Sequence, residues 1–229
     1  MGQRLTDLNF EEWVVHIFDH PVADPAWHWD MNAEWWSSAP EETISYLTQL
    51  FENDGAILAP YSDAQLNQGF WYLVSSASGD YLRILQDSAL PIQDRIRCIQ
   101  SIFNLYEQVF AVRCSPHLSN LLRTNEPQPN DLSALNAVCY MWWDISPLYG
   151  GMEVDNLSLI SEAVLNVMKK ILELDSIACQ ESALHGLGHW HLYFPKETYD
   201  IVEKWFDTHP DISEDLRQYA ERAQAGAVL

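Results

Sequence analysis

The chain has 229 residues, of which 48% are apolar and 12% aromatic, so it can build a sizeable core and does not have the composition of a disordered chain. Its 33 acidic residues against 12 basic ones give a net charge of −21, which repels phosphate backbones and anionic membrane surfaces and argues against direct binding of nucleic acid or lipid. Since no run approaches about 20 apolar residues and no apolar leader is present, we expect a cytoplasmic protein with a single helical domain over residues 1–229.

Most of the chain carries the sequence marks of α-helices. Apolar residues of 91–113 and 156–174 recur at spacings of three and four, the period of a helix buried along one face. Pro40, followed by two glutamates, is typical of a helix start, and Ser62 and Gln65 have the spacing of a capping box. In chain order, the expected helices cover 7–19, about 40–53, 62–74, 91–113, 131–144, 156–174, 176–192, 196–207 and 213–225.

The two clearest helices each have a predicted core face. In 156–174 the apolar stripe includes Leu159 and Ile160. In 91–113 the polar residues fall on the opposite face, which we expect to lie in water: Asp94, Arg95, Arg97 and Gln100. Both helices therefore need neighbouring helices that cover their apolar sides.

Two segments are expected to be irregular. Residues 20–39 contain Pro21 and Pro25 among several tryptophans, and 115–130 contain three prolines and mark an expected junction between helical layers. Sequence evidence for strands is scarce, and the connections between the last helices are short, so neighbouring helices should pack as antiparallel pairs. The expected fold class is all-α.

Negative charge is concentrated in the first third of the chain, together with tryptophan. Residues 1–80 hold thirteen acidic residues and one basic residue, Arg4, a net charge of −12. Carboxylates beside aromatic faces are suited to bind Lys and Arg, and Trp is enriched among interface hot spots. We therefore expect a surface that binds a basic protein partner, made of Asp24, Trp27, Trp29, Asp30, Glu34, Trp35, Trp36, Glu41 and Glu42. The alternative is a loop held on the core by its own tryptophans.

Three histidines lie close together in the segment His-Gly-Leu-Gly-His-Trp-His. On a helix, His185 and His189 project from one face at a separation that suits two imidazoles on one Zn²⁺, whereas His191 points about 200° away from His189. The third ligand of a metal site would come from elsewhere, with Asp144, Glu181 and His117 as candidates. We expect instead that Gly186 and Gly188 allow a close helix crossing with the histidines hydrogen-bonded at its edge, and that the chain holds no metal or cofactor.

The cysteines and a second aromatic cluster are expected in the core. The four cysteines are widely spaced and form no C-x-x-C pair, which predicts reduced, buried thiols: Cys98, Cys114, Cys139 and Cys179. The segment 139–144 has helical spacing typical of a core, with Asp144 at its end facing the same groove as the histidines. The sequence contains no nucleophile elbow, P-loop or dinucleotide-binding fingerprint, so we expect no catalytic activity.

The run 183–190, Ala-Leu-His-Gly-Leu-Gly-His-Trp, followed by a proline turn and a helix around 199–206, resembles a HEAT-type helical repeat. This resemblance implies an α-solenoid that binds proteins along one surface. Because the flanking helices show no clean period, a compact helical bundle is the alternative architecture.

By its acidity, helical character and size, the chain also resembles bacterial immunity proteins of contact-dependent growth inhibition systems, which neutralise nuclease toxins. This resemblance implies a non-catalytic cytoplasmic protein that masks a basic nuclease toxin domain with carboxylates. We therefore expect an immunity protein. Two alternatives are a HEAT-like scaffold with another partner and a metal-dependent hydrolase that uses His185 and His189.

Overall fold

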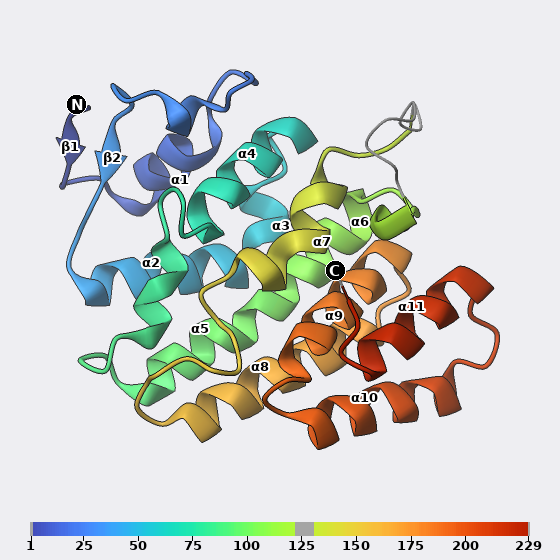
Figure 1. The fold of residues 1–229 in the computed structure, drawn as a ribbon. Coiled ribbons are helices and arrows are strands. Elements are labelled where there is room, and N and C mark those ends of the chain that lie inside the picture. The colour runs from blue at the N-terminus through green and yellow to red at the C-terminus, as the bar shows by residue number, and fades with distance from the viewer. Residues whose placement is uncertain (1, 122–130, 229) are drawn as a thin grey trace.

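The protein is described by a computed structural model over residues 2–121 and 131–228, and the secondary structure of these residues is almost entirely helical (Figure 1). One short parallel pair joins the strands β1 (Arg4–Leu5) and β2 (Trp35–Trp36). The α-helices are α1 (Phe10–Phe18), α2 (Pro40–Glu52), α3 (Asp54–Ile57), α4 (Asp63–Val74), α5 (Ile92–Leu105), α6 (Ala111–Arg113), α7 (Leu135–Ile145), α8 (Leu157–Leu172), α9 (Ile177–Trp190), α10 (Pro195–Thr208) and α11 (Glu214–Gln224). Shorter turns of other helix types are η1 (Trp27–Trp29), η2 (Tyr81–Gln86), η3 (Tyr106–Phe110) and η4 (Ser119–Leu121).

The predicted helices are present, with ends that differ by a few residues. The capping box is confirmed, because the Ser62 side chain accepts the Gln65 backbone N–H while the Gln65 side chain accepts that of Ser62. The helix expected at 91–113 runs from α5 through the π turn η3 into α6. A single π turn within an α-helix disturbs its regularity without ending it, so periodicity alone did not reveal η3.

The helices stack in two rows (Figure 1). Helices α1, α4, α7 and α9 follow one another in one row, and α2, α5, α8 and α10 in the other. Helix α9 also contacts α8, α10 and α11, so it lies inside the C-terminal half rather than at the end of an open array. The all-α prediction is confirmed, and the architecture is a compact helical bundle. Buried residues from Phe10 to Val228 belong to one continuous core.

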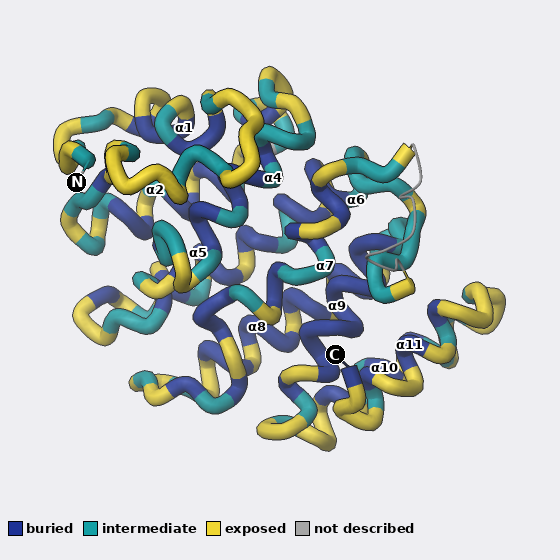
Figure 2. The backbone as a smooth tube through the Cα atoms, turned by 45° about the horizontal axis from the view of Figure 1, so that its top comes forward, coloured by how far each residue is buried: buried dark blue, intermediate teal, exposed yellow. Residues whose placement is uncertain are grey.

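Helix α9 is buried along almost its whole length (Figure 2). Gly186 allows this burial, since a Cβ atom there would stand only 2.7 Å from Sδ of Met168 and from Cγ of Trp143. The close helix crossing predicted from this glycine is therefore present. The buried residues of α9 include four polar ones: Gln180, Glu181, Ser182 and His185. Buried polar groups require partners, so this helix carries a polar network inside the bundle.

Two predictions of helix burial are wrong, and one predicted layer junction lies mostly outside the described residues. Arg95, expected in water, is fully buried, and its Nη2 donates to Oδ2 of Asp155 at 2.8 Å. Leu159, expected in the core, is 45% exposed. Periodicity shows that a helix has two faces, but which parts of each face are covered depends on neighbours such as α8 against α5. Most of the expected layer junction near 115–130 falls on 122–130, which lie outside the described residues.

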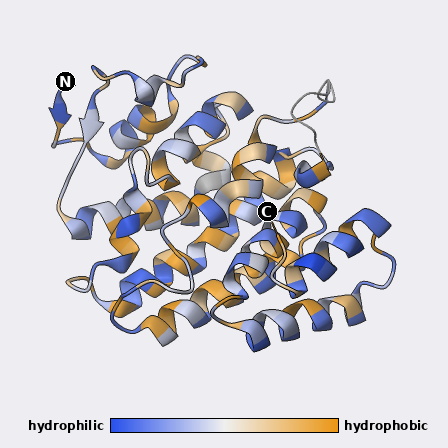
Figure 3. Ribbon diagram, viewed as in Figure 1, coloured by the Kyte–Doolittle hydropathy of each residue, from blue (hydrophilic) through white to orange (hydrophobic). Residues whose placement is uncertain are grey.

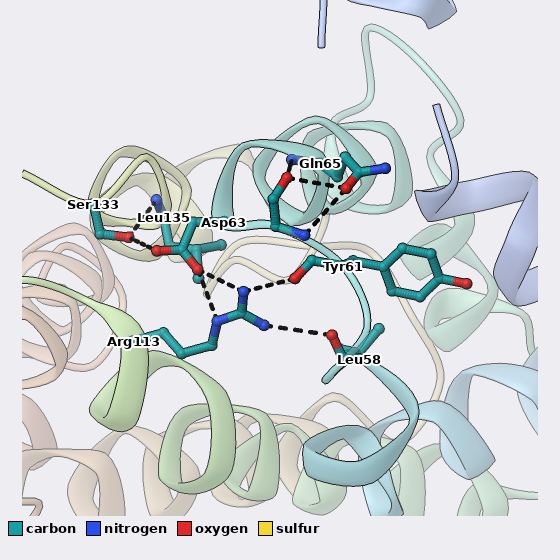
Figure 4. A network of polar contacts seen from close by, with 8 residues as sticks. Leu58, Tyr61, Asp63, Gln65, Arg113, Ser133 and Leu135 are labelled. Atoms are coloured by element: carbon teal, nitrogen blue, oxygen red, sulfur yellow. Dashed lines mark hydrogen bonds and ion pairs between the residues drawn. The ribbon is translucent and has the colours of Figure 1, made fainter. Parts of the chain in front are cut away.

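A polar network ties α6 to the beginning of α4 and to the residues before α7 (Figure 4). Arg113 donates through Nε to Oδ1 of Asp63 at 2.7 Å and through Nη2 to the backbone oxygen of Tyr61 at 2.7 Å. Ser133 Oγ donates to the other oxygen of Asp63, also at 2.7 Å. Because Asp63 is the first residue of α4, this network fixes where α4 begins relative to α6.

Replacing Arg113 by Met is expected to lower the free energy of unfolding by about 1–3 kcal/mol, because Asp63 and the Tyr61 carbonyl lose a charged donor in a partly buried site. The control is Arg97→Met, which removes an ion pair of the same 2.7 Å length. Because the Arg97 side chain is 66% exposed, this loss should be clearly smaller than that of Arg113→Met. Urea denaturation of both variants measures the difference, and equal losses would contradict the role of the Arg113 network.

The outer helices are amphipathic. Hydrophilic and hydrophobic residues alternate along α10 and α11, which lie at one edge of the bundle (Figure 3).

Within the described ranges, no helix combines the length and the apolar character needed to cross a membrane.

Candidate functional site

The short parallel pair of strands separates two neighbouring tryptophans of the acidic segment. Arg4 lies opposite Trp35, and Leu5 opposite Trp36. Adjacent strand residues point to opposite faces, and accordingly Trp35 is 44% exposed and Trp36 only 2%. Trp36 stacks on Tyr46 with ring centroids 5.5 Å apart. The Trp36 side chain therefore belongs mainly to the core, and its predicted contact with a partner stays a prediction.

The other two tryptophans of this segment divide in the same way. Trp27 is partly buried, stacks on His20 with centroids 3.8 Å apart, and packs on Tyr72 at 4.7 Å. Trp29 is 55% exposed. Trp27 and Trp36 thus attach the segment to the core, whereas Trp29 and Trp35 face outward, and their contact with a partner stays a prediction.

A hollow of about 360 Å³ opens beside Trp35, and we call it the acidic hollow. Its lining residues are Trp27, His28, Asp30, Ala33, Glu34, Trp35, Trp36, Tyr72, Ala77, Ser78, Gly79 and Tyr81. None of the described residues that line it is Lys or Arg. Asp30 and Glu34 are exposed and line this hollow together with aromatic residues, a combination that suits an ammonium or guanidinium group. Oδ1 of Asp30 also accepts the backbone N–H of Asn32 at 2.9 Å.

The remaining predicted acids lie apart from this hollow. Asp24 is exposed in the loop before η1. Glu41 and Glu42 lie in the first turn of α2, and Glu41 lines a separate hollow with residues of α5. Asp30 and Glu34 thus line the acidic hollow with three of the tryptophans, whereas Asp24, Glu41 and Glu42 do not line it.

A histidine cluster supports Trp27 from the side of α1. His16 and His20 lie on α1 and at its end, and rings of His16, His20 and His28 all contact Trp27. Burial, followed by repulsion from His20, lowers the pKa of His16 to about 4 and also lowers the pKa of His28. The cluster was not predicted, because His28 is brought to α1 by the fold of the loop.

The second candidate site lies where α9 meets the end of α7. Nε2 of His185 and Nε2 of His189 are 3.2 Å apart, and Oδ1 of Asp144 is 3.5 Å from Nε2 of His189. One ligand atom from each of the three residues lies within 4.8 Å of the others. His185 is buried, whereas the side chains of His189 and Asp144 are 38% and 40% exposed. His191 points away, as predicted, and contacts Oγ1 of Thr198 at 3.2 Å.

Two tyrosines hold His185 from behind. Nδ1 of His185 lies 2.7 Å from the hydroxyl oxygen of Tyr219 on α11, which in turn lies 3.1 Å from the hydroxyl of Tyr140 on α7. Burial, with a smaller contribution from His189, lowers the pKa of His185 to about 4, so its imidazole is neutral at neutral pH. Burial also raises the pKa of Tyr219, which therefore remains a phenol that can donate and accept.

The other two candidates for a third metal ligand are engaged elsewhere. Both carboxylate oxygens of Glu181 accept backbone N–H groups, from Ser119 at 2.7 Å and Asn120 at 2.8 Å. Burial raises the pKa of Glu181 to about 7 against the opposing effect of these donors. Nε2 of His117 lies 3.3 Å from Oδ1 of Asp131. Of the three candidates, the structure places only Asp144 with the histidine pair.

A hollow that the sequence did not predict, of about 910 Å³, lies between α8 and α10. Its apolar lining includes Leu159, Phe194 and Ile201, with charged residues of both signs such as Lys169 and Asp200. The apolar stripe of 156–174 includes Leu159, but we predicted that this stripe packs in the core. The hollow was therefore not expected.

The cysteines are free thiols, three of them buried and Cys114 partly buried. Burial raises the pKa of Cys98 to about 12, so this thiol is protonated and unreactive at neutral pH. The core position predicted for the cysteines is confirmed for Cys98, Cys139 and Cys179.

Comparison of the chain with protein-family models, curated proteins and solved structures gave no match. Function is therefore inferred from the geometry of the two sites.

Proposed function

We propose that the chain is a non-catalytic binding protein that receives basic side chains of a partner protein in the acidic hollow. The observation that carries this proposal is the lining of the hollow, which includes the exposed residues Asp30, Glu34 and Trp35, while none of the described lining residues is Lys or Arg. A guanidinium or ammonium group there gains charge-assisted hydrogen bonds and a cation–π contact.

The contact made by Arg4 supports the same proposal. Its guanidinium carbon lies 5.6 Å from the ring centroid of Trp35, and its Nη2 donates to Oγ of Ser37 at 3.1 Å. The only basic residue of the first 80 is thus bound at the edge of the acidic hollow by an indole and a neutral oxygen. A partner's Arg or Lys would meet the same indole with carboxylates beside it.

Net charge and exposed aromatic area would contribute in two further ways to binding of a basic partner. The net charge of −21 attracts a cationic protein over long range and speeds its association. Trp29, 55% exposed near the hollow, offers the large apolar surface that slows dissociation once a complex has formed. Together they favour a partner with a basic, partly apolar surface.

In its most specific form, the proposal is a cytoplasmic immunity protein that covers the basic groove of a nuclease toxin. Carboxylates would occupy the positions that substrate phosphates take in that groove, so binding and inhibition would be one event. This form is supported by the resemblance in acidity, size and helical character.

The test uses the full chain and the protein encoded by the neighbouring gene, where a toxin is expected. Asp30→Asn combined with Glu34→Gln should weaken their complex at least about tenfold, because two charge-assisted contacts are lost. Asp207→Asn combined with Asp211→Asn makes the same change in net charge on exposed residues of the C-terminal half and should leave the affinity within about twofold. Equal affinities of the two variants would contradict the acidic hollow, and a neighbouring product that is not basic would contradict the immunity role.

A further inference from the structure

The geometry at the meeting point of α7 and α9 carries a second assignment, independent of the acidic hollow. We infer that Asp144, His185 and His189 bind a divalent transition-metal ion, with Zn²⁺ as the expected occupant. The donor set of two imidazoles and one carboxylate is among those that zinc prefers.

The distances between the donor atoms fit a tetrahedral ion. Two ligand atoms that are each about 2.0–2.1 Å from Zn²⁺ lie about 3.3 Å apart along an edge of the tetrahedron. The separation of the Nε2 atoms of His185 and His189 is 3.2 Å, and that from His189 Nε2 to Asp144 Oδ1 is 3.5 Å. The third edge, from Asp144 to His185, is at most 4.8 Å and closes with a small rotation of the partly exposed Asp144 side chain.

The surroundings of His185 favour the tautomer that a metal needs. A zinc-bound imidazole donates its other N–H to a fixed acceptor, which orients the ring and directs the lone pair at the ion. Nδ1 of His185 has such an acceptor in the hydroxyl oxygen of Tyr219 at 2.7 Å, and the Tyr219 hydroxyl can donate onward to Tyr140 at 3.1 Å. With Nδ1 as the donor, Nε2 of His185 faces His189 and Asp144 as a free acceptor.

Rigidity and access also fit a metal site. His185 is fixed on the most buried helix of the bundle, whereas His189 and Asp144 reach the surface. The fourth position of the ion therefore faces solvent, where zinc sites with three protein ligands hold water or a ligand.

A direct hydrogen bond between the two imidazoles would give the same 3.2 Å separation, so the test must separate it from metal binding. The full chain, purified without a histidine tag and freed of metal, is titrated with Zn²⁺ by calorimetry. We expect one equivalent to bind. His189→Ala should weaken binding at least about 100-fold, Asp144→Asn about tenfold or more, and Tyr219→Phe about tenfold, since it removes the acceptor for His185.

Matched controls keep the outcome clear. His189 and Asp144 are partly exposed, so their variants should retain the wild-type circular dichroism spectrum, and Co²⁺ absorption gives a second readout of the ligand set. His117→Ala removes a histidine that lies outside the site and should leave Zn²⁺ affinity within about twofold, as should Asp30→Asn with Glu34→Gln. Absence of stoichiometric Zn²⁺ binding, or binding that survives both His189→Ala and Asp144→Asn, would overturn the assignment without affecting the acidic hollow.

Discussion

Replacing Trp36 by Ala is expected to lower the free energy of unfolding by about 3–5 kcal/mol, because a large side chain that is only 2% exposed leaves a cavity among other aromatic rings. Its ring contacts Trp13, Tyr46 and Tyr81 at centroid distances of 5.5 to 5.8 Å. The hydroxyl of Tyr81 also donates to the Trp36 backbone oxygen at 2.9 Å. Guanidinium denaturation measures the loss.

The matched variant is its neighbour, Trp35→Ala. This change removes the contact with Arg4 but no core packing, so it should cost about 1 kcal/mol or less. Trp35→Ala should instead weaken binding of a basic partner. If the two tryptophan variants lost equal stability, the division between a core and an outward-facing tryptophan would be contradicted.

Lowering the pH is expected to reduce the free energy of unfolding through His16, which supports the tryptophan-rich loop. Its pKa is about 4 in the folded chain, lowered from 6.5 by burial, so the unfolded chain takes up the proton first. The stability that depends on neutral His16 is fully present above pH 6.5 and is lost as the pH falls toward 4. Relative to His16→Gln, the wild type should lose about 2–3 kcal/mol between pH 7 and pH 4.

Comparing the wild type with His16→Gln at each pH isolates the contribution of His16 to the free energy of unfolding. Glu181, with a pKa raised to about 7, has the opposite effect, since its contribution to stability is lost as the pH rises from its ordinary value of 4.5 through 7. It is present in both proteins and cancels in the difference. Urea denaturation at four pH values gives the two curves, and parallel curves would contradict a neutral, buried His16.

The sequence predicted the helices well because their signals are local. Apolar spacing and the capping box of Ser62 depend on residues within one turn or two, and these elements are present. The burial of Arg95 and the exposure of Leu159 depend on contacts between α5, α8 and α10, which lie far apart along the chain. A helical period identifies faces but does not show which neighbour covers each part of them.

In the candidate sites, too, local patterns could be predicted from the sequence, whereas contacts between distant segments could not. The i, i+4 spacing of His185 and His189 predicted their approach, and the position of Asp144 at a helix end made it one of three candidates for the third ligand. The support from Tyr219 was not visible, since it comes from α11. In the acidic segment, composition identified the region, but only the strand pairing shows that Trp36 points inward.

Binding of an arginine decapeptide, followed by tryptophan fluorescence, addresses the acidic hollow without knowledge of the natural partner. Two variants with equal net charge, −19 in place of −21, are compared with the wild type. The first neutralises the two acids that line the acidic hollow, as Asp30→Asn with Glu34→Gln. The second neutralises two exposed acids of the C-terminal half, as Glu173→Gln with Asp175→Asn.

The expected result is salt-sensitive binding by the wild type, a loss of about tenfold or more in the first variant, and a change of no more than about twofold in the second. Equal binding by the two variants would show that total charge alone attracts the peptide, and would contradict a receptor for basic side chains beside Trp35.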